Sequence, residues 1–202
     1  MQRTVEFVFD VGSPYSYLAY HALPAIAQAA GAQIVWRPIL LGAAIKASAN
    51  HSPFEVPAKM RWVEQDLLRC AQALAVPFSL NPHFPVNTLV AMRIATGLQL
   101  RRPDDFPAWV EASFRAMWAQ GRNLADPAEL AAVIREAGFD DRELLALASD
   151  QAVKDKLRGD TDAAIARGVF GAPTFFVGEQ MFWGHDRLEQ VARALAQQGA
   201  QP

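Results

Sequence analysis

The order of its strand-like and helix-like segments limits what this chain can fold into more than any other feature of the sequence. Strand patterns, rich in β-branched and aromatic residues, occur near the two ends of the chain, at residues 4–10, 33–37, 174–177 and 181–183. A helical pattern fills residues 58–167 between them and also covers 15–30 and 187–197. The opening strand–helix–strand unit predicts two parallel strands, and one four-stranded sheet forms if the two ends of the chain pack together.

An α/β fold in two parts follows from that order. Residues 1–57 and 168–202 are predicted to form the sheet domain, and residues 58–167 an all-helical subdomain inserted between its halves. Residues 41–57 are predicted to be a loop, because Gly42, Asn50 and two prolines interrupt the regular pattern. A chain of 202 residues is long enough for one domain with a sizeable insertion.

Charge and composition exclude several classes of protein. The 19 Lys and Arg residues against 21 Asp and Glu give a net charge of −2 without a long run of one sign, which argues against nucleic-acid binding. Neither a signal-peptide core nor an apolar run of about 18 residues is present, so we expect no membrane contact and a cytoplasmic location. The single cysteine, Cys70, cannot form an intramolecular disulfide and falls on an apolar helix stripe typical of a buried residue. The four histidines lack metal-ligand spacing, so no metal is expected.

Ser13 and Pro14 stand where the first strand gives way to a helix. Proline suits the first helical position and serine suits the N-cap before it. Unpaired N–H groups and the positive end of the helix dipole stabilise an anion at such a point, and they lower the pKa of a thiol held there. The Ser13 hydroxyl could donate a hydrogen bond to a sulfur anion that the chain does not itself carry. The alternative is that Ser13 is an N-cap and nothing more.

Pro173 stands directly before the short strand pattern at residues 174–177. Proline has no N–H to give to the middle of a sheet, so this position suits a tight turn with a cis peptide bond. A cis bond would turn the N–H and C=O of Ala172 outward, ready to pair with an extended peptide. The alternative is an ordinary loop proline, because trans is the commoner form.

Together these features resemble one known family. The strand order, the helical insertion and the proline before the third strand are similar to the thioredoxin-like fold in its DsbA-type arrangement. Ser13-Pro14-Tyr15-Ser16 resembles the Cys-Pro-Tyr-Cys redox motif of that fold with serine in place of both cysteines, so disulfide exchange is excluded. Within this superfamily the chain is most similar to the kappa-class glutathione transferases and the 2-hydroxychromene-2-carboxylate isomerases. The matching segments are FDVGSPYSYLA, WRPILLGA, SANHSP, FPVNTLVAMR, GVFGAPTFFV and FWGHDRL.

The resemblance implies that glutathione is the cofactor and that Ser13 holds its sulfur as a thiolate. It assigns the rest of the tripeptide to Asn50 and Lys59 near the glycine end, to Ala172 before a cis Pro173 at the cysteinyl part, and to His185 and Asp186 at the γ-glutamyl end. From the residues alone, Asn50 also suits a turn, Lys59 a solvated surface and Asp186 an N-cap. Some relatives carry a small hydroxyl residue at the position of His185, so the role of its imidazole stays open.

The resemblance also implies a site for a small substrate derived from an aromatic compound. Asn87, within FPVNTL, resembles the isomerase branch and is expected to face this substrate. An apolar wall is expected among the aromatic residues Tyr15, Phe54, Trp62, Phe84 and Trp183, any of which could instead belong to the core.

The function implied is a glutathione-dependent isomerase. It would interconvert a chromene carboxylate and trans-o-hydroxybenzylidenepyruvate through a glutathione adduct, with glutathione regenerated at each turnover. A kappa-class transferase, which releases the conjugate as product, is the first alternative, and a non-catalytic DsbA-like binding protein is the second. The resemblance also implies a homodimer.

Overall fold

The computed structural model describes residues 2–49, 51 and 53–198. Its elements follow in the order β1 (Arg3–Phe9), α1 (Pro14–Ala30), β2 (Ala32–Pro38), α2 (Leu41–Ala47), the 3₁₀ turn η1 (Pro53–Glu55), α3 (Pro57–Ala73), α4 (Leu89–Arg101), the 3₁₀ turn η2 (Pro103–Asp105), α5 (Phe106–Trp118), α6 (Pro127–Glu136), α7 (Asp141–Ser149), α8 (Gln151–Ala166), β3 (Thr174–Val177), β4 (Gln180–Trp183), the 3₁₀ turn η3 (His185–Arg187) and α9 (Leu188–Gln198). Both ends of the chain contribute strands to one sheet, as the order of patterns predicted.

The four strands lie in the order β2-β1-β3-β4. β1 and β2 are parallel, which confirms the prediction for the opening unit, whereas β3 runs antiparallel to both β1 and β4. Phe7 in the middle of β1 lies opposite Trp36 on one side and Phe175 on the other. The rings of Phe7 and Phe175 stack with centroids 5.4 Å apart. This row of aromatic side chains holds the two ends of the chain together.

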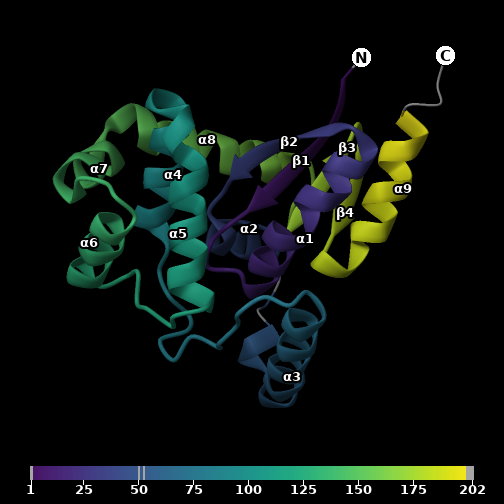
Figure 1. Ribbon diagram of the computed structural model, residues 1–202, viewed down its shortest axis with the longest axis horizontal. Coiled ribbons are helices and arrows are strands. Elements are labelled where there is room, and N and C mark those ends of the chain that lie inside the picture. The colour runs from purple at the N-terminus through teal and green to yellow at the C-terminus, as the bar shows by residue number, and fades with distance from the viewer. Residues whose placement is uncertain (1, 50, 52, 199–202) are drawn as a thin grey trace.

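The alternation of side chains along β1 places a hydrophobic core on each face of the sheet. Phe7 and Phe9 point into the larger core, which α1 and α9 cover. Val8 points to the opposite face, where it packs with Ala44 of α2 and Ala164 of α8. Figure 1 shows the resulting layers, with α1 crossing one face of the sheet and α8 behind it.

The helices between the strands separate into two groups. Helices α4 to α7 gather at one side of the sheet, whereas α3 projects away from them and contacts α1 and η1 (Figure 1). Helix α8 falls within the predicted helical subdomain, residues 58–167, yet it packs against β2 and α2 of the sheet domain. The boundaries of the two domains stay a prediction.

The start of α1 confirms its sequence signals, but the predicted loop at residues 41–57 is wrong in its first half. Pro14 occupies the first turn of α1, and Ser13 is its N-cap. Leu41–Ala47 forms α2 instead of a loop. Its sequence consists mainly of good helix formers, and one glycine, Gly42, costs only about 1 kcal/mol in a helix. A long-range contact also fixes its start, because the Leu41 N–H donates to the Asp10 carboxylate at 2.9 Å.

Candidate active site

The Ser13 side chain joins the start of α1 to the segment before β3. Its hydroxyl oxygen accepts a hydrogen bond from the Ser16 N–H at 3.1 Å, which confirms the N-cap interpretation. The hydroxyl also donates to the carbonyl oxygen of Ala172 at 2.8 Å. Two residues that sequence reasoning placed separately around one ligand are therefore in direct contact, although they are 159 positions apart.

Asp10 anchors the loop that carries Ser13. It lies directly after β1, is 4% exposed, and accepts three hydrogen bonds. Its Oδ1 accepts from the Gly12 N–H at 2.9 Å and from the Thr88 hydroxyl at 2.7 Å, and its Oδ2 accepts from the Leu41 N–H at 2.9 Å. Burial raises the pKa of Asp10, and these three donors oppose that shift. One carboxyl group thus holds together the Ser13 loop and the starts of α2 and α4.

A second anchor comes from the aromatic side chains behind the loop. The Trp118 Nε1–H of α5 donates to the Val11 carbonyl at 2.7 Å. The ring of Phe84 packs against Trp118, with centroids 5.8 Å apart, and against Phe54 at 4.5 Å. Two of the residues predicted to wall the substrate site are therefore in contact with each other and linked to the Ser13 loop through Trp118.

The segment before β3 is shaped by small residues. The Ala172–Pro173 peptide bond is cis, which is one of the two forms that the sequence left open. The Pro173 carbonyl accepts a hydrogen bond from the Gly184 N–H at 3.0 Å. The Trp183 indole lies so near Gly171 that a Cβ there would be 2.7 Å from Nε1. Residue 171 must therefore be small for Trp183, which is 49% exposed, to lie beside this turn.

Tyr15 and His185 stack beside the start of α1, with ring centroids 4.8 Å apart and planes 19° from parallel. The His185 Nε2 lies 3.3 Å from the Cys70 Sγ. The Tyr15 hydroxyl donates to Asp66 Oδ2 at 3.5 Å, one turn before Cys70 on α3. The interpretation of Cys70 as a buried core residue holds only in part: Cys70 packs against the larger core, but it is partly exposed.

Burial sets the protonation of this cluster. It raises the pKa of Tyr15, and the charge of Asp66 raises it further. It also raises the pKa of the Cys70 thiol, with Asp66 and Asp186 acting in the same direction. Burial lowers the pKa of His185, although the two carboxylates oppose that shift. At neutral pH the cluster therefore presents an uncharged phenol, thiol and imidazole next to the start of α1.

The lowered pKa of His185 predicts a loss of stability in mild acid. Protonation is harder in the folded chain than in the unfolded one, so the stabilisation is complete above about pH 6.5 and declines as the pH falls through the folded-state pKa. Urea unfolding between pH 5 and about pH 7.5 should show a shallower pH dependence in His185→Gln than in the wild type. Identical slopes, or an imidazole that titrates above its ordinary pKa by NMR, would contradict this assignment.

Not every predicted residue belongs to this stacked and hydrogen-bonded group, although the charge of Asp186 acts on it. Asp186 follows His185 in η3 and forms an ion pair with Arg187 at 2.7 Å. Lys59 is exposed in the first turn of α3, and no described contact joins it to the cluster. Asn87 is exposed, and its Oδ1 accepts from the Leu89 N–H at 3.0 Å, so it shapes the start of α4. Asn50 lies outside the described residues.

Sequence reasoning missed the residues that position the site rather than form it. Asp10 was included in the first strand pattern, although a carboxyl group at the end of an apolar strand and three residues before Ser13 was a usable signal. Nothing local marked Asp66 or Cys70, because their partners lie on another helix and in η3.

Two kinds of feature are absent from the described residues. Within residues 2–49, 51 and 53–198, no three His, Cys, Asp or Glu side chains are grouped so that they could hold a metal ion. In the same part of the chain, no helix has the length and apolar character needed to span a bilayer. The chemistry offered is that of a helix N-terminus with a hydroxyl group, which can hold an anion.

A β2-β1-β3-β4 sheet, with a proline-started helix after β1 and a cis proline before β3, defines a protein of the thioredoxin-like class. The family model described as the DSBA-like thioredoxin domain matches residues 4–196, and the chain belongs to that family. The fold class expected from the sequence is confirmed.

Two groups of enzymes within the family are the relatives that this chain resembles. A 2-hydroxychromene-2-carboxylate isomerase of Sphingobium xenophagum is 35% identical over 94% of this chain and 96% of its own length. Glutathione S-transferase kappa 2 of Caenorhabditis elegans is 31% identical over 97% of this chain and 93% of its own. A solved structure of 2-hydroxychromene-2-carboxylate isomerase superimposes with a TM-score of 0.84 at 31% identity, covering 98% of both chains. The expected similarity to both enzyme groups is confirmed.

Proposed function

We propose that this chain is a glutathione-dependent 2-hydroxychromene-2-carboxylate isomerase, which interconverts the chromene carboxylate and trans-o-hydroxybenzylidenepyruvate. Relatives with the isomerase name match nearly the whole chain, and a solved isomerase shares its fold. The observation that carries the proposal is the hydroxyl of Ser13, which lies at the N-terminus of α1 and contacts the residue before the cis proline. Such a position favours a negatively charged sulfur.

The residues that we assign to glutathione suit a tripeptide with charged ends. Asp186 offers a carboxylate for an ammonium group, and Lys59 offers an exposed cation for a carboxylate. Gly184 has a φ of +102°, and a Cβ there would lie 2.5 Å from Asp186 Oδ1. Glycine at this position therefore leaves room for the Asp186 carboxylate beside the backbone. The backbone of Ala172 is assigned to the cysteinyl part, and the start of η3, with His185, to the γ-glutamyl end.

Bound glutathione supplies a nucleophilic sulfur to the reaction. In the proposed complex, Ser13 turns its hydroxyl proton from the Ala172 carbonyl toward that sulfur, and the first N–H groups of α1 oppose the same charge. Each pKa unit by which the thiol is acidified corresponds to about 1.4 kcal/mol. Tyr15 and His185 border the site as neutral groups, since the pKa of Tyr15 is raised and that of His185 is lowered. Phe84 and Asn87 are assigned to the substrate.

Removal of glutathione tests the proposal directly. We expect the chain, freed of thiols by gel filtration, to show no isomerisation of 2-hydroxychromene-2-carboxylate and to recover full activity when glutathione is added. Glutathione should not be consumed, because the isomerase regenerates it. Activity without glutathione would contradict the cofactor assignment. A calorimetric titration without any binding of glutathione would instead favour a DsbA-like binding protein.

The transferase alternative rests on the kappa-class relative. It is distinguished by its product, since accumulation of a stable glutathione conjugate of the substrate would identify a transferase. The proposal also includes a homodimeric state and a cytoplasmic location. Light scattering of the purified chain measures the oligomeric state.

A further inference from the structure

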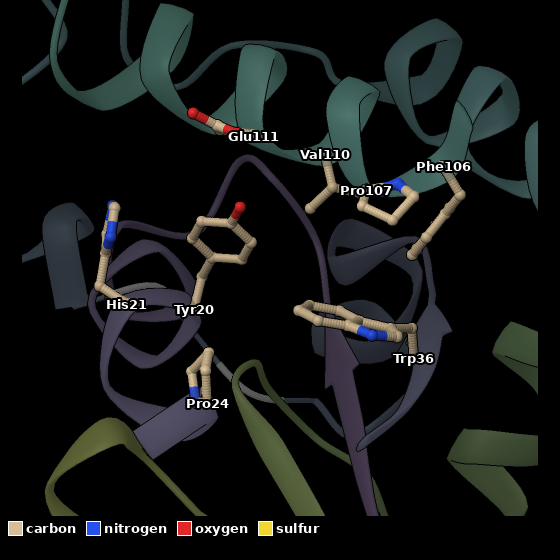
Figure 2. Close-up of a pocket in the computed structure, with 8 residues that line it drawn as sticks. All are labelled: Tyr20, His21, Pro24, Trp36, Phe106, Pro107, Val110 and Glu111. Atoms are coloured by element: carbon tan, nitrogen blue, oxygen red, sulfur yellow. The ribbon is translucent and has the colours of Figure 1, made fainter. Parts of the chain in front are cut away.

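A cleft of about 340 Å³ lies away from Ser13, between α1, β2 and α5. Figure 2 shows eight side chains around one open space: Tyr20, His21 and Pro24 of α1, Trp36 of β2, and Phe106, Pro107, Val110 and Glu111 of α5. This volume is within the range of small-molecule sites. Most of the walls are aromatic rings, proline rings and a valine, so the space suits a compact hydrocarbon group.

The cleft is on the far side of α1 from the candidate active site. At 100° per residue, residues 20, 21 and 24 fall roughly 140–240° around the helix from Tyr15, which stacks on His185. Tyr20 is also about 10 Å further along the helix axis than Ser13, at 1.5 Å per residue. A compound bound here would therefore not compete directly for the space around Ser13.

The polar groups of the cleft carry one negative charge. Glu111 is the sole ionic side chain among the eight, and within the described part of the chain it forms no ion pair, although Arg115 lies one turn further along α5. Burial, assisted by the charge of Glu111, raises the pKa of Tyr20 to about 12. Burial lowers the pKa of His21, against the charge of Glu111. Neither side chain therefore neutralises Glu111 at pH 7.

Pro24 removes one hydrogen bond from the backbone of α1. It has no N–H, so the Tyr20 carbonyl four residues earlier lacks its ordinary intrahelical donor. In the cleft, a carboxylate and two aromatic rings are present together, and these are groups that recognise an organic cation. They would disfavour the carboxylate of the substrate proposed above.

We propose that this cleft is a second binding site, which takes a small organic ammonium compound with an aromatic or aliphatic body. The Glu111 carboxylate opposes the charge of the ammonium group, and the Tyr20 and Trp36 rings pack against the hydrocarbon. The proposal does not depend on the isomerase activity, because it uses none of the residues assigned to glutathione or the substrate.

A matched pair of probes tests this charge preference. The ¹⁵N-labelled full chain is titrated with 2-phenylethylammonium and, separately, with 2-phenylethanol, which has the same body without the charge. We expect the ammonium compound to shift the amide signals of the non-proline residues at positions 20–23, 36, 106 and 108–111, and to bind about 5-fold more tightly than the alcohol, which is the most that one exposed charge contact ordinarily contributes. Equal affinities, or shifts confined to other residues, would overturn the proposal.

Two variants locate the charge. Glu111→Gln should weaken binding of the ammonium compound about 5-fold and leave the alcohol unchanged, while glutathione-dependent activity stays at the wild-type level. Glu179→Gln removes the same charge from the exposed turn between β3 and β4 and should change neither affinity. If both variants weaken binding equally, only the net charge matters and the site is rejected. If the chain dimerises through this face and the ammonium compound does not bind, the proposed site is rejected as well.

Discussion

Replacement of Ser13 by alanine should lower glutathione-dependent turnover about 30-fold at neutral pH. A hydrogen bond donated to a charged acceptor contributes roughly 2 kcal/mol, and its loss should raise the pKa of the bound thiol by about 1.5 units. The ultraviolet difference absorbance of the thiolate, followed against pH in the bound state, measures that pKa independently of turnover. Unchanged thiolate absorbance together with unchanged turnover would mean that Ser13 serves only as the N-cap.

Ser16→Ala is the matched control for this experiment. Ser16 is fully buried, and its hydroxyl has no hydrogen-bond partner in the described part of the chain. The substitution keeps the backbone N–H that donates to Ser13, so turnover should stay at the wild-type level. Ser13→Ala also loses the N-cap, which costs about 1 kcal/mol and lowers Tm by roughly 2–4 °C. Assays well below the transition therefore separate the chemical effect from the loss of stability.

Local signals were enough to predict most of the sheet and the start of α1. Alternation of apolar residues marked β1, and the pair Ser13 and Pro14 marked the helix that follows, because cap preferences act within a few residues. Leu41–Ala47 failed as a local prediction, since a seven-residue helix has few periodic positions and one of them is Gly42. Its start depends on the Asp10 carboxylate, which is 31 positions away.

The site was predictable in its parts and not in its connections. The resemblance to a known family pointed to Ser13, Ala172 and His185, but three contacts that fix their neighbourhood join residues far apart in the chain. They are Ser13 with Ala172, separated by 159 positions, Cys70 with His185, separated by 115, and Asp10 with Thr88, separated by 78. Contacts of this kind depend on how elements pack, and hydrophobic periodicity carries no information about their polar partners.

Asp10→Ala should be the most destabilising single change near the site, with a loss of about 4 kcal/mol in the free energy of unfolding. The substitution leaves the N–H groups of Gly12 and Leu41 and the hydroxyl of Thr88 without their acceptor inside the protein. Each buried donor without a partner costs roughly 1–3 kcal/mol. Urea unfolding monitored by tryptophan fluorescence measures the loss, and Tm should fall by roughly 8–16 °C.

Two comparison variants show whether this loss comes from the hydrogen bonds of Asp10. Thr88→Val removes one donor to Asp10 and leaves no buried hydroxyl without a partner, so the free energy of unfolding should fall by only about 1 kcal/mol. The double variant Asp10→Ala with Thr88→Val should lose less than the sum of the two single losses. Asp162→Ala, on an exposed position of α8, should be close to neutral.

Turnover of Asp10→Ala, measured where the protein is still folded, should also fall about 10-fold, because a misplacement of Ser13 by a fraction of an ångström weakens its contact with the sulfur. A variant within about 1 kcal/mol of the wild type, with full activity, would show that Trp118 alone is sufficient to position the Ser13 loop.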